Sequence, residues 1–220
     1  MKRYDIAIFD LDGTLLDTLD DIAAALNRTI AKHGFPERTR QQVEASVGNG
    51  SAYLLKSSCP EDADAELLKE ILEEYRADYR ENCDVLTRAY PGVEELLRRL
   101  KIAGVPAAVN TNKPQPAAEK LVQAHFPGRA ELVLGENPEM PRKPHPAGVW
   151  KVLDTFGINP EDALYVGDSI TDYKTAKNAG VDFAWLTWGY QDPDEMPEDA
   201  KQRAFSDAGA LCNFILGQAR

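Results

Sequence analysis

Hydrophobic and polar positions along the chain follow two different periods. Short runs that are almost entirely apolar are typical of strands buried on both faces of a parallel sheet. They occupy residues 6–9, 105–109, 132–134, 163–166 and 183–186. Between these runs apolar residues recur every three or four positions, as at Leu96, Leu97 and Leu100, which predicts helices. The alternation of strand and helix after residue 91 predicts an α/β fold with a doubly wound parallel sheet.

The stretch that follows the first run has a different character. Apolar residues recur at helical spacing over 19–30 and again over 67–79, and the turn signal Val-Gly-Asn-Gly at 47–50 separates the two patterns. We find no convincing strand pattern there. We therefore predict a small helical domain inserted after the first strand. The predicted parts are residues 1–17 and 86–220 for the α/β core and 18–85 for the helical cap.

Composition narrows the class of protein. The 220 residues carry a net charge of -11, and a surface this acidic repels phosphate backbones, so we expect no nucleic-acid partner. The three cysteines are widely spaced and form no CxxC pair, which argues against a zinc site or a disulfide framework and favours a cytoplasmic location. No stretch approaches the roughly 18 apolar residues of a membrane span, and the charged N-terminal run does not resemble a signal peptide.

The first apolar run ends in a pair of acids. Asp10 stands where the strand stops, and Asp12, Gly13 and Thr14 follow in a predicted tight turn. A carboxylate at this edge of the sheet can attack phosphorus and form an acyl-phosphate. A second carboxylate two residues on can protonate the leaving oxygen and then accept a proton from water. Because two acids this close repel each other, the pair also calls for a cation.

Three further motifs follow predicted strands. After 105–109, Thr111 and the backbone N–H of Asn112 are placed to hold phosphoryl oxygens at a helix N-terminus. Lys143, in a proline-rich turn, can pair with the nucleophile and neutralise phosphoryl charge. Asp168 follows 163–166 and is a candidate metal ligand, whereas Asp172 either serves the metal from the outer shell or caps a helix with Ser169. A site built of oxygen ligands alone favours Mg²⁺.

These four motifs, in this order, resemble the haloacid dehalogenase superfamily of phosphotransferases. The resemblance implies that Asp10 is nucleophile and metal ligand, and that Asp12 is general acid/base and binds metal through its backbone carbonyl. It further implies that Thr111 and Lys143 hold the phosphoryl group and that Asp168 completes a magnesium site. The helical insert resembles the small cap that closes over substrate in this superfamily.

A narrower resemblance is to phosphoglycolate phosphatases. It rests on residues 111–114, on 47–50 and on the predicted hinge 16–18, and it implies that Gly48, Asn49 and Gly50 face the substrate together with Gly13. The expected partner is a small phosphorylated metabolite, and the expected state is a monomer or a homodimer.

Other functions stay open at this point. A sugar phosphomutase of the same superfamily is one alternative, although such enzymes typically carry a hydrophobic residue where Thr14 stands. A dehalogenase would leave Asp12 and the metal site without a purpose. A non-catalytic binding protein that has kept the fold is the third alternative, and it would have no use for closely spaced acids that cost stability.

Overall fold

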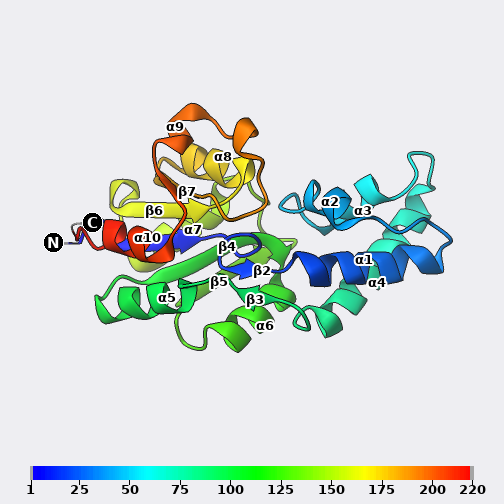
Figure 1. Cartoon of the computed structure of the whole chain (residues 1–220), viewed down its shortest axis with the longest axis horizontal. Coiled ribbons are helices and arrows are strands. Elements are labelled where there is room, and N and C mark those ends of the chain that lie inside the picture. The colour runs from blue at the N-terminus through cyan, green and yellow to red at the C-terminus, as the bar shows by residue number, and fades with distance from the viewer. Residues whose placement is uncertain (1, 219–220) are drawn as a thin grey trace.

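Six parallel strands form the central sheet of the computed structural model, which describes residues 2–218 (Figure 1). Their spatial order is β5, β4, β1, β6, β7, β8, so the first strand of the chain lies near the middle. The strands are β1 (Ile6–Phe9), β4 (Ala107–Pro114), β5 (Leu132–Glu136), β6 (Ala163–Gly167), β7 (Asp182–Leu186) and β8 (Ala204–Phe205).

Helices cover both faces of this sheet. Because side chains alternate along a strand, Ile6 and Ile8 of β1 point into one hydrophobic core and Ala7 and Phe9 into the other. The first core contains α7 (Ala147–Phe156), α8 (Ile170–Ala179) and α9 (Glu198–Lys201). The second contains α5 (Val93–Ile102), α6 (Gln115–His125) and α10 (Ala208–Ile215). The prediction of a doubly wound parallel α/β sheet is confirmed.

Four helices lie together in the part of the chain between β1 and α5. They are α1 (Leu19–Lys32), α2 (Arg40–Glu44), α3 (Ser51–Ser58) and α4 (Ala65–Asn82). We call residues 18–85 the helical block; Figure 1 shows its helices grouped at one end of the molecule, away from α5 and α10. The structure assigns no strand to residues 18–85, as the sequence pattern indicates.

The two crossings between the helical block and the sheet lie side by side. There the short strands β2 (Leu16–Asp17) and β3 (Arg88–Ala89) pair antiparallel. The buried carboxylate of Asp21, in the first turn of α1, accepts hydrogen bonds from the backbone N–H groups of Val85, Leu86 and Thr87 and from the Thr87 hydroxyl, at 2.8–3.0 Å. This single acid therefore ties the outgoing and returning segments together.

Two expectations about the core need correction. The strand expected at 105–109 begins at Ala107 and continues to Pro114, because β5 pairs with it as far as Pro114. The second motif therefore lies within a strand. The prediction that Thr111 and Asn112 stand at a helix N-terminus is wrong, because α6 begins only at Gln115. After Leu186 the chain also forms α9, β8 and α10, for which we predicted no elements.

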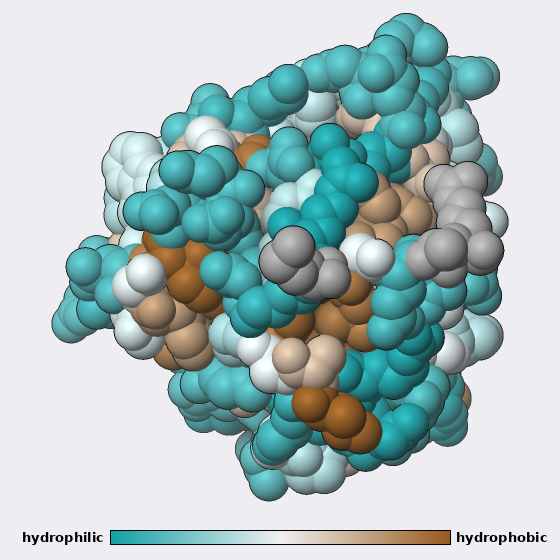
Figure 2. Space-filling model, turned by 90° about the vertical axis from the view of Figure 1, so that its left-hand side faces the viewer, coloured by the Kyte–Doolittle hydropathy of each residue, from teal (hydrophilic) through white to brown (hydrophobic). Residues whose placement is uncertain are grey.

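The surface at the end away from the helical block is largely hydrophilic, with hydrophobic residues in separate patches (Figure 2). Among the described residues, no helix combines the length and the apolar character needed to cross a bilayer.

Candidate active site

The register of the sheet brings the four motifs to one place. Phe9 at the end of β1 pairs with Val109 on one side and with Val166 on the other. The next residues, Asp10 just after β1 and Gly167 at the end of β6, therefore lie at the same level. Asp168 follows one position later, and Thr111 stands at a similar height on β4. Strand ends on both sides of β1 thus converge on Asp10.

Three buried acids form a tight cluster at this edge. Carboxylate oxygens of Asp10, Asp168 and Asp172 all lie within 4.8 Å of one another. Lys143, whose side chain is 3% exposed, places its Nζ 2.7 Å from Asp172 Oδ1 and 2.8 Å from Asp10 Oδ1. Only the first of these contacts has hydrogen-bond geometry, and Asp10 Oδ1 is buried without a hydrogen-bond partner among the described residues.

The charges of this cluster are not balanced. Burial, followed by the charge of Asp172, raises the pKa of Asp10 from its ordinary 3.8 to about 6. Burial and the same neighbour raise the pKa of Asp168 well above its usual range. Burial opposes the charge of Lys143, but the carboxylates of Asp10 and Asp172 hold its pKa well above normal, so it remains an ammonium.

A divalent cation fits this set of donors. Asp10, Asp168 and Asp172 supply three clustered carboxylates, against the single ammonium group of Lys143. The surplus of two negative charges matches one divalent ion, and Asp10 Oδ1, which contacts Lys143 without hydrogen-bond geometry, is an oxygen that such an ion could bind. Oxygen donors alone favour Mg²⁺ over softer metals.

Two hydrogen bonds and two closely packed glycines fix the position of the Asp168 side chain. The Thr14 hydroxyl donates to its Oδ1 at 2.7 Å, and the backbone N–H of Tyr190 donates to its Oδ2 at 2.9 Å. A Cβ added to Gly13 would lie 2.4 Å from Asp168 Oδ2, and one added to Gly189 would lie 2.2 Å from Asp168 Cβ. The absence of a side chain at Gly13 therefore makes room for Asp168, and its predicted contact with substrate stays a prediction.

Asp172 caps a helix, as one interpretation of its motif predicted, and its carboxylate also belongs to the acid cluster, whereas its role towards a metal stays a prediction. Its Oδ2 accepts hydrogen bonds from the backbone N–H and the hydroxyl of Ser169, which completes a capping box at the start of α8. Its Oδ1 faces the cluster and accepts from Lys143. The same carboxylate therefore caps a helix and contributes charge to the site.

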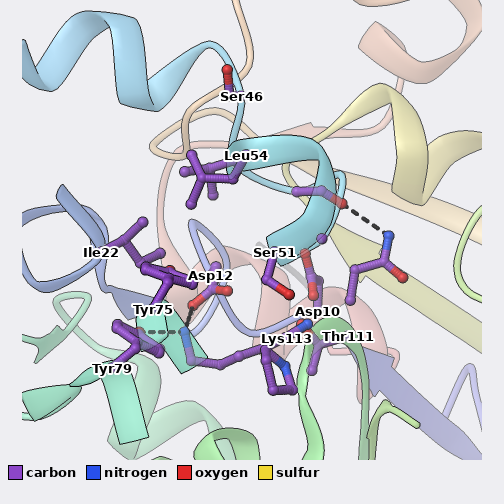
Figure 3. A pocket seen from close by; sticks show the side chains of 15 residues that line it. Asp10, Asp12, Ile22, Ser46, Ser51, Leu54, Tyr75, Tyr79, Thr111 and Lys113 are labelled. Atoms are coloured by element: carbon purple, nitrogen blue, oxygen red, sulfur yellow. Dashed lines mark hydrogen bonds and ion pairs between the residues drawn. The ribbon is translucent and has the colours of Figure 1, made fainter. Parts of the chain in front are cut away.

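Asp12 is oriented away from the three clustered acids. Its Oδ1 accepts hydrogen bonds from Lys113 Nζ and from the Thr18 hydroxyl, both at 2.6 Å. Asp10 and Asp12 nevertheless line the same pocket, where Figure 3 shows the Lys113 ammonium between Asp12 and Tyr79. The expectation that both acids serve one site is consistent with this, but the side chain of Asp12 is not part of the acid cluster.

Two cavities meet at Asp10 and Asp12. The smaller, which we call the inner pocket, has a volume of about 40 Å³ and lies between the core and the helical block. Its walls are mostly apolar, with Ile22, Leu54 and Tyr75 supplied by the block (Figure 3). The outer cleft has about 780 Å³ and a polar lining from α2, α8 and residues 189–195.

The remaining predicted site residues lie around these cavities. Gly48 lines both, Gly50 lines the inner pocket and Asn49 the outer cleft, so the 47–50 turn does face the site. Thr111 is buried beside Asp10 in the inner pocket. Asn112 also lines the inner pocket, and its side-chain amide donates to the carbonyls of Gly48 and Lys143 and accepts from the Lys143 N–H. Its side chain is therefore already occupied by contacts within the protein.

Sequence reasoning missed Lys113 and Tyr79. Lys113 has a side chain only 2% exposed, and it donates to Asp12 and, at 2.6 Å, to the Tyr79 hydroxyl. The available signal was spacing, because Thr111 and Lys113 are two apart on an extended strand and so share a side. Tyr79 gave no such signal. Tyr75 and Tyr79 are four residues apart, which is the spacing expected of residues on the buried face of an amphipathic helix.

Comparison with known proteins places this geometry in a family. The model of haloacid dehalogenase-like hydrolases matches residues 7–186. The chain belongs to this family. A curated relative, the phosphoglycolate phosphatase of Pseudomonas putida, is 34% identical to this hydrolase over 215 residues, covering 94% of this chain and 78% of the relative. Another, the N-acetylmuramic acid 6-phosphate phosphatase of Pseudomonas aeruginosa, is 32% identical over 200 residues. The match covers 90% of this chain and 88% of that relative.

Solved structures agree with the fold of this hydrolase. One, described as a phosphoglycolate phosphatase from Lactobacillus delbrueckii subsp. bulgaricus, superposes with a TM-score of 0.90 at 29% identity. The superposition covers 99% of this chain and 100% of the other. The family membership predicted from the four motifs is therefore confirmed.

Proposed function

We propose that this hydrolase is a Mg²⁺-dependent phosphatase that cleaves a small phosphate monoester through an aspartyl-phosphate on Asp10. The observation that carries the proposal is the environment of that carboxylate. The residue follows β1, it is 4% exposed and it lines both cavities, and its buried Oδ1 has an ion-pair contact with Lys143 but no hydrogen bond from the described residues. A buried anion kept beside Lys143 without a full set of hydrogen bonds is costly, and a catalytic role accounts for that cost.

The reaction divides into two displacements. In the first, an oxygen of Asp10 bonds to phosphorus while the ester P–O bond breaks, and the proton of the Asp12 carboxyl passes to the leaving oxygen. In the second, Asp12 accepts a proton from a water molecule whose oxygen bonds to phosphorus, and the bond between phosphorus and Asp10 breaks. Thr111 and Lys143 hold the phosphoryl oxygens and offset their charge.

Asp10 and Asp168 would hold the metal, with the backbone carbonyl of Asp12 and with Asp172 nearby. Bound there, Mg²⁺ would supply positive charge next to the phosphoryl group.

Pocket size and relatives together support a two-carbon substrate of the phosphoglycolate type. Asp12 must reach the leaving oxygen. It lines both cavities, but its Oδ1 is held by Lys113, which lines the inner pocket and not the outer cleft, so we expect the organic part of the substrate in the inner pocket. A volume of about 40 Å³ suits a very small group. A larger ester such as N-acetylmuramic acid 6-phosphate would have to extend into the outer cleft.

The helical block acts, in this proposal, as a cap that excludes water from the site. Three contacts between block and core support it: Asn112 with the carbonyl of Gly48, Arg142 with the carbonyl of Asn49, and Lys113 with Tyr79. The block also supplies the apolar wall of the inner pocket. A cytoplasmic location and a monomeric or homodimeric state remain predictions from the sequence.

The test is a screen of the purified protein with Mg²⁺ against phosphoglycolate, N-acetylmuramic acid 6-phosphate and glucose 1-phosphate. We expect release of inorganic phosphate, fastest from phosphoglycolate, and its loss in EDTA and in Asp10→Asn. Asp5→Asn is the matched control, because Asp5 precedes the same strand but its side chain is half exposed and, among residues 2–218, pairs only with the surface residue Lys2.

Each alternative gives a different result. Isomerisation of glucose 1-phosphate without net phosphate release would identify a phosphomutase. No turnover of any ester would favour a non-catalytic protein. Wild-type activity in a verified Asp10→Asn preparation would refute the assigned nucleophile.

A further inference from the structure

Lys113 is a buried cation for which the reaction outlined above has no use. It lies on β4, its side chain is 2% exposed, and burying an ammonium is unfavourable unless it is paired and hydrogen-bonded. The structure provides three contacts for it, one with Asp12 and two with Tyr79. Nζ donates to Asp12 Oδ1 and to the Tyr79 hydroxyl, each at 2.6 Å, and lies 4.6 Å from the centre of the Tyr79 ring. Lys113 is thus fixed in one position rather than left to reach for solvent.

Lys113 contacts only one of the two carboxylate oxygens of Asp12. Lys113 and Thr18 both donate to Oδ1, and no described residue donates to Oδ2. With Oδ1 held, the carboxyl cannot rotate freely, and Oδ2 is left to exchange a proton with substrate or water. Proton transfer depends steeply on such orientation, because the donor oxygen must lie within hydrogen-bond reach of the leaving oxygen.

The helical block completes this arrangement. Tyr79 is on α4, and its hydroxyl accepts a hydrogen bond from the same ammonium that donates to Asp12 (Figure 3). Two hydrogen bonds, from Lys113 to Tyr79 and from Lys113 to Asp12, therefore connect the helical block, through β4, to the loop after β1. We propose that Lys113, held by Tyr79, is a positioning residue that orients Asp12 for proton transfer, so that the general acid is fully aligned only when the block is docked on the core.

This inference rests on the proposed function, since it assigns Asp12 the proton that goes to the leaving group. In that step the P–O ester bond breaks, its electron pair stays on the leaving oxygen, and the Asp12 proton converts that oxygen to a hydroxyl. A substrate whose leaving group is already stable as an anion does not need the proton. The dependence of rate on the leaving group therefore distinguishes an effect on proton transfer from general damage to the site.

The experiment compares two small substrates that differ in this respect. Phosphoglycolate releases an alkoxide, which needs a proton, whereas acetyl phosphate releases acetate, which does not. The parameter is kcat/KM, since it reports steps up to formation of the aspartyl-phosphate and excludes its hydrolysis. The variants are Lys113→Met, which removes the charge at similar length, and Tyr79→Phe, which removes only the hydroxyl.

Two controls match these variants. Lys120→Met removes an exposed lysine of α6 that also contacts α4, through the carbonyls of Arg80 and Glu81, and that has no carboxylate partner among the described residues there. Tyr53→Phe removes a half-exposed hydroxyl from the block. Thermal unfolding of each variant verifies that it is folded.

For Lys113→Met we expect kcat/KM to fall roughly 10- to 100-fold with phosphoglycolate and by less than about 3-fold with acetyl phosphate, within the range of general-acid effects. Tyr79→Phe should show the same selective loss on a smaller scale. Equal losses on both substrates in folded variants, or no loss on either, would overturn the inference and leave the proposed function intact. Wild-type protein inactive on both substrates, or Asp10→Asn active on them, would overturn the proposed function itself.

Discussion

The unbalanced charge of the acid cluster has a measurable consequence for stability. Asp10 has an ordinary pKa of 3.8 and a pKa of about 6 in the folded protein, for which burial and Asp172 are responsible. A raised carboxyl pKa means that the protonated form favours folding. That stability is fully present below pH ~4, the unfolded pKa, and is lost as the pH rises through about 6. Metal-free protein should therefore become less stable from pH 4 to pH 7.5.

The variant Asp10→Asn isolates this contribution, because an amide of nearly the same shape carries no charge at any pH. A shift of about two pKa units corresponds to about 3 kcal/mol. Lys143 keeps its partner Asp172 in the variant, so no ammonium is left unpaired. In EDTA, the stability of the variant relative to wild type should rise by about 2 kcal/mol between pH 4 and pH 7.5, because part of the full effect already falls below pH 4.

Urea denaturation at the two pH values, followed by circular dichroism, measures the difference. Asp5→Asn again serves as the control and should show no comparable change with pH, because the Asp5 side chain is half exposed. Adding Mg²⁺ at pH 7.5 should stabilise the wild type more than Asp10→Asn, since a cation bound only by the folded state adds to its stability. A stability difference between Asp10→Asn and wild type that is the same at both pH values would refute the reasoning.

Two further predictions concern residues that support the site. Asp21→Ala leaves three backbone N–H groups of residues 85–87 without an acceptor, so we expect a loss of about 2–4 kcal/mol in the free energy of unfolding; a loss below about 1 kcal/mol would contradict the role assigned to Asp21. Gly189→Ala brings a methyl group to 2.2 Å from Asp168 Cβ and must displace that acid. We expect the Mg²⁺ concentration for half-maximal activity to rise about 10- to 100-fold, and an unchanged Mg²⁺ requirement would show that Asp168 is not a ligand.

The sequence was informative where function depends on the order of strands. A buried strand followed at once by Asp10, and another followed by Gly167 and Asp168, must deliver their acids to the same edge if the strands are parallel neighbours. The convergence of the motifs could therefore be predicted without knowing a single distance. The helical character of residues 18–85 was also evident, because amphipathic periodicity is a local property.

Features that depend on tertiary packing could not be predicted in this way. The extension of β4 to Pro114 arises from its pairing with β5, which no local pattern encodes. The Lys113–Tyr79 contact joins residues 34 positions apart in the sequence. Tyr79 also belongs to the row of apolar positions on α4 that predicts burial in the hydrophobic core. Asp21 resembles any acid in the first turn of a helix until the returning chain supplies its donors. The two-residue strands β2 and β3 are too short to leave a periodic signal.

The covalent intermediate is the claim on which the mechanism depends. Mixing the enzyme with saturating phosphoglycolate and Mg²⁺, quenching within milliseconds and reducing with borohydride converts any aspartyl-phosphate to homoserine, which peptide mass spectrometry can locate. The account predicts homoserine at position 10 and at no other acid of the site, and none in samples quenched without substrate. Homoserine at another position, or its absence while the enzyme turns over, would contradict it.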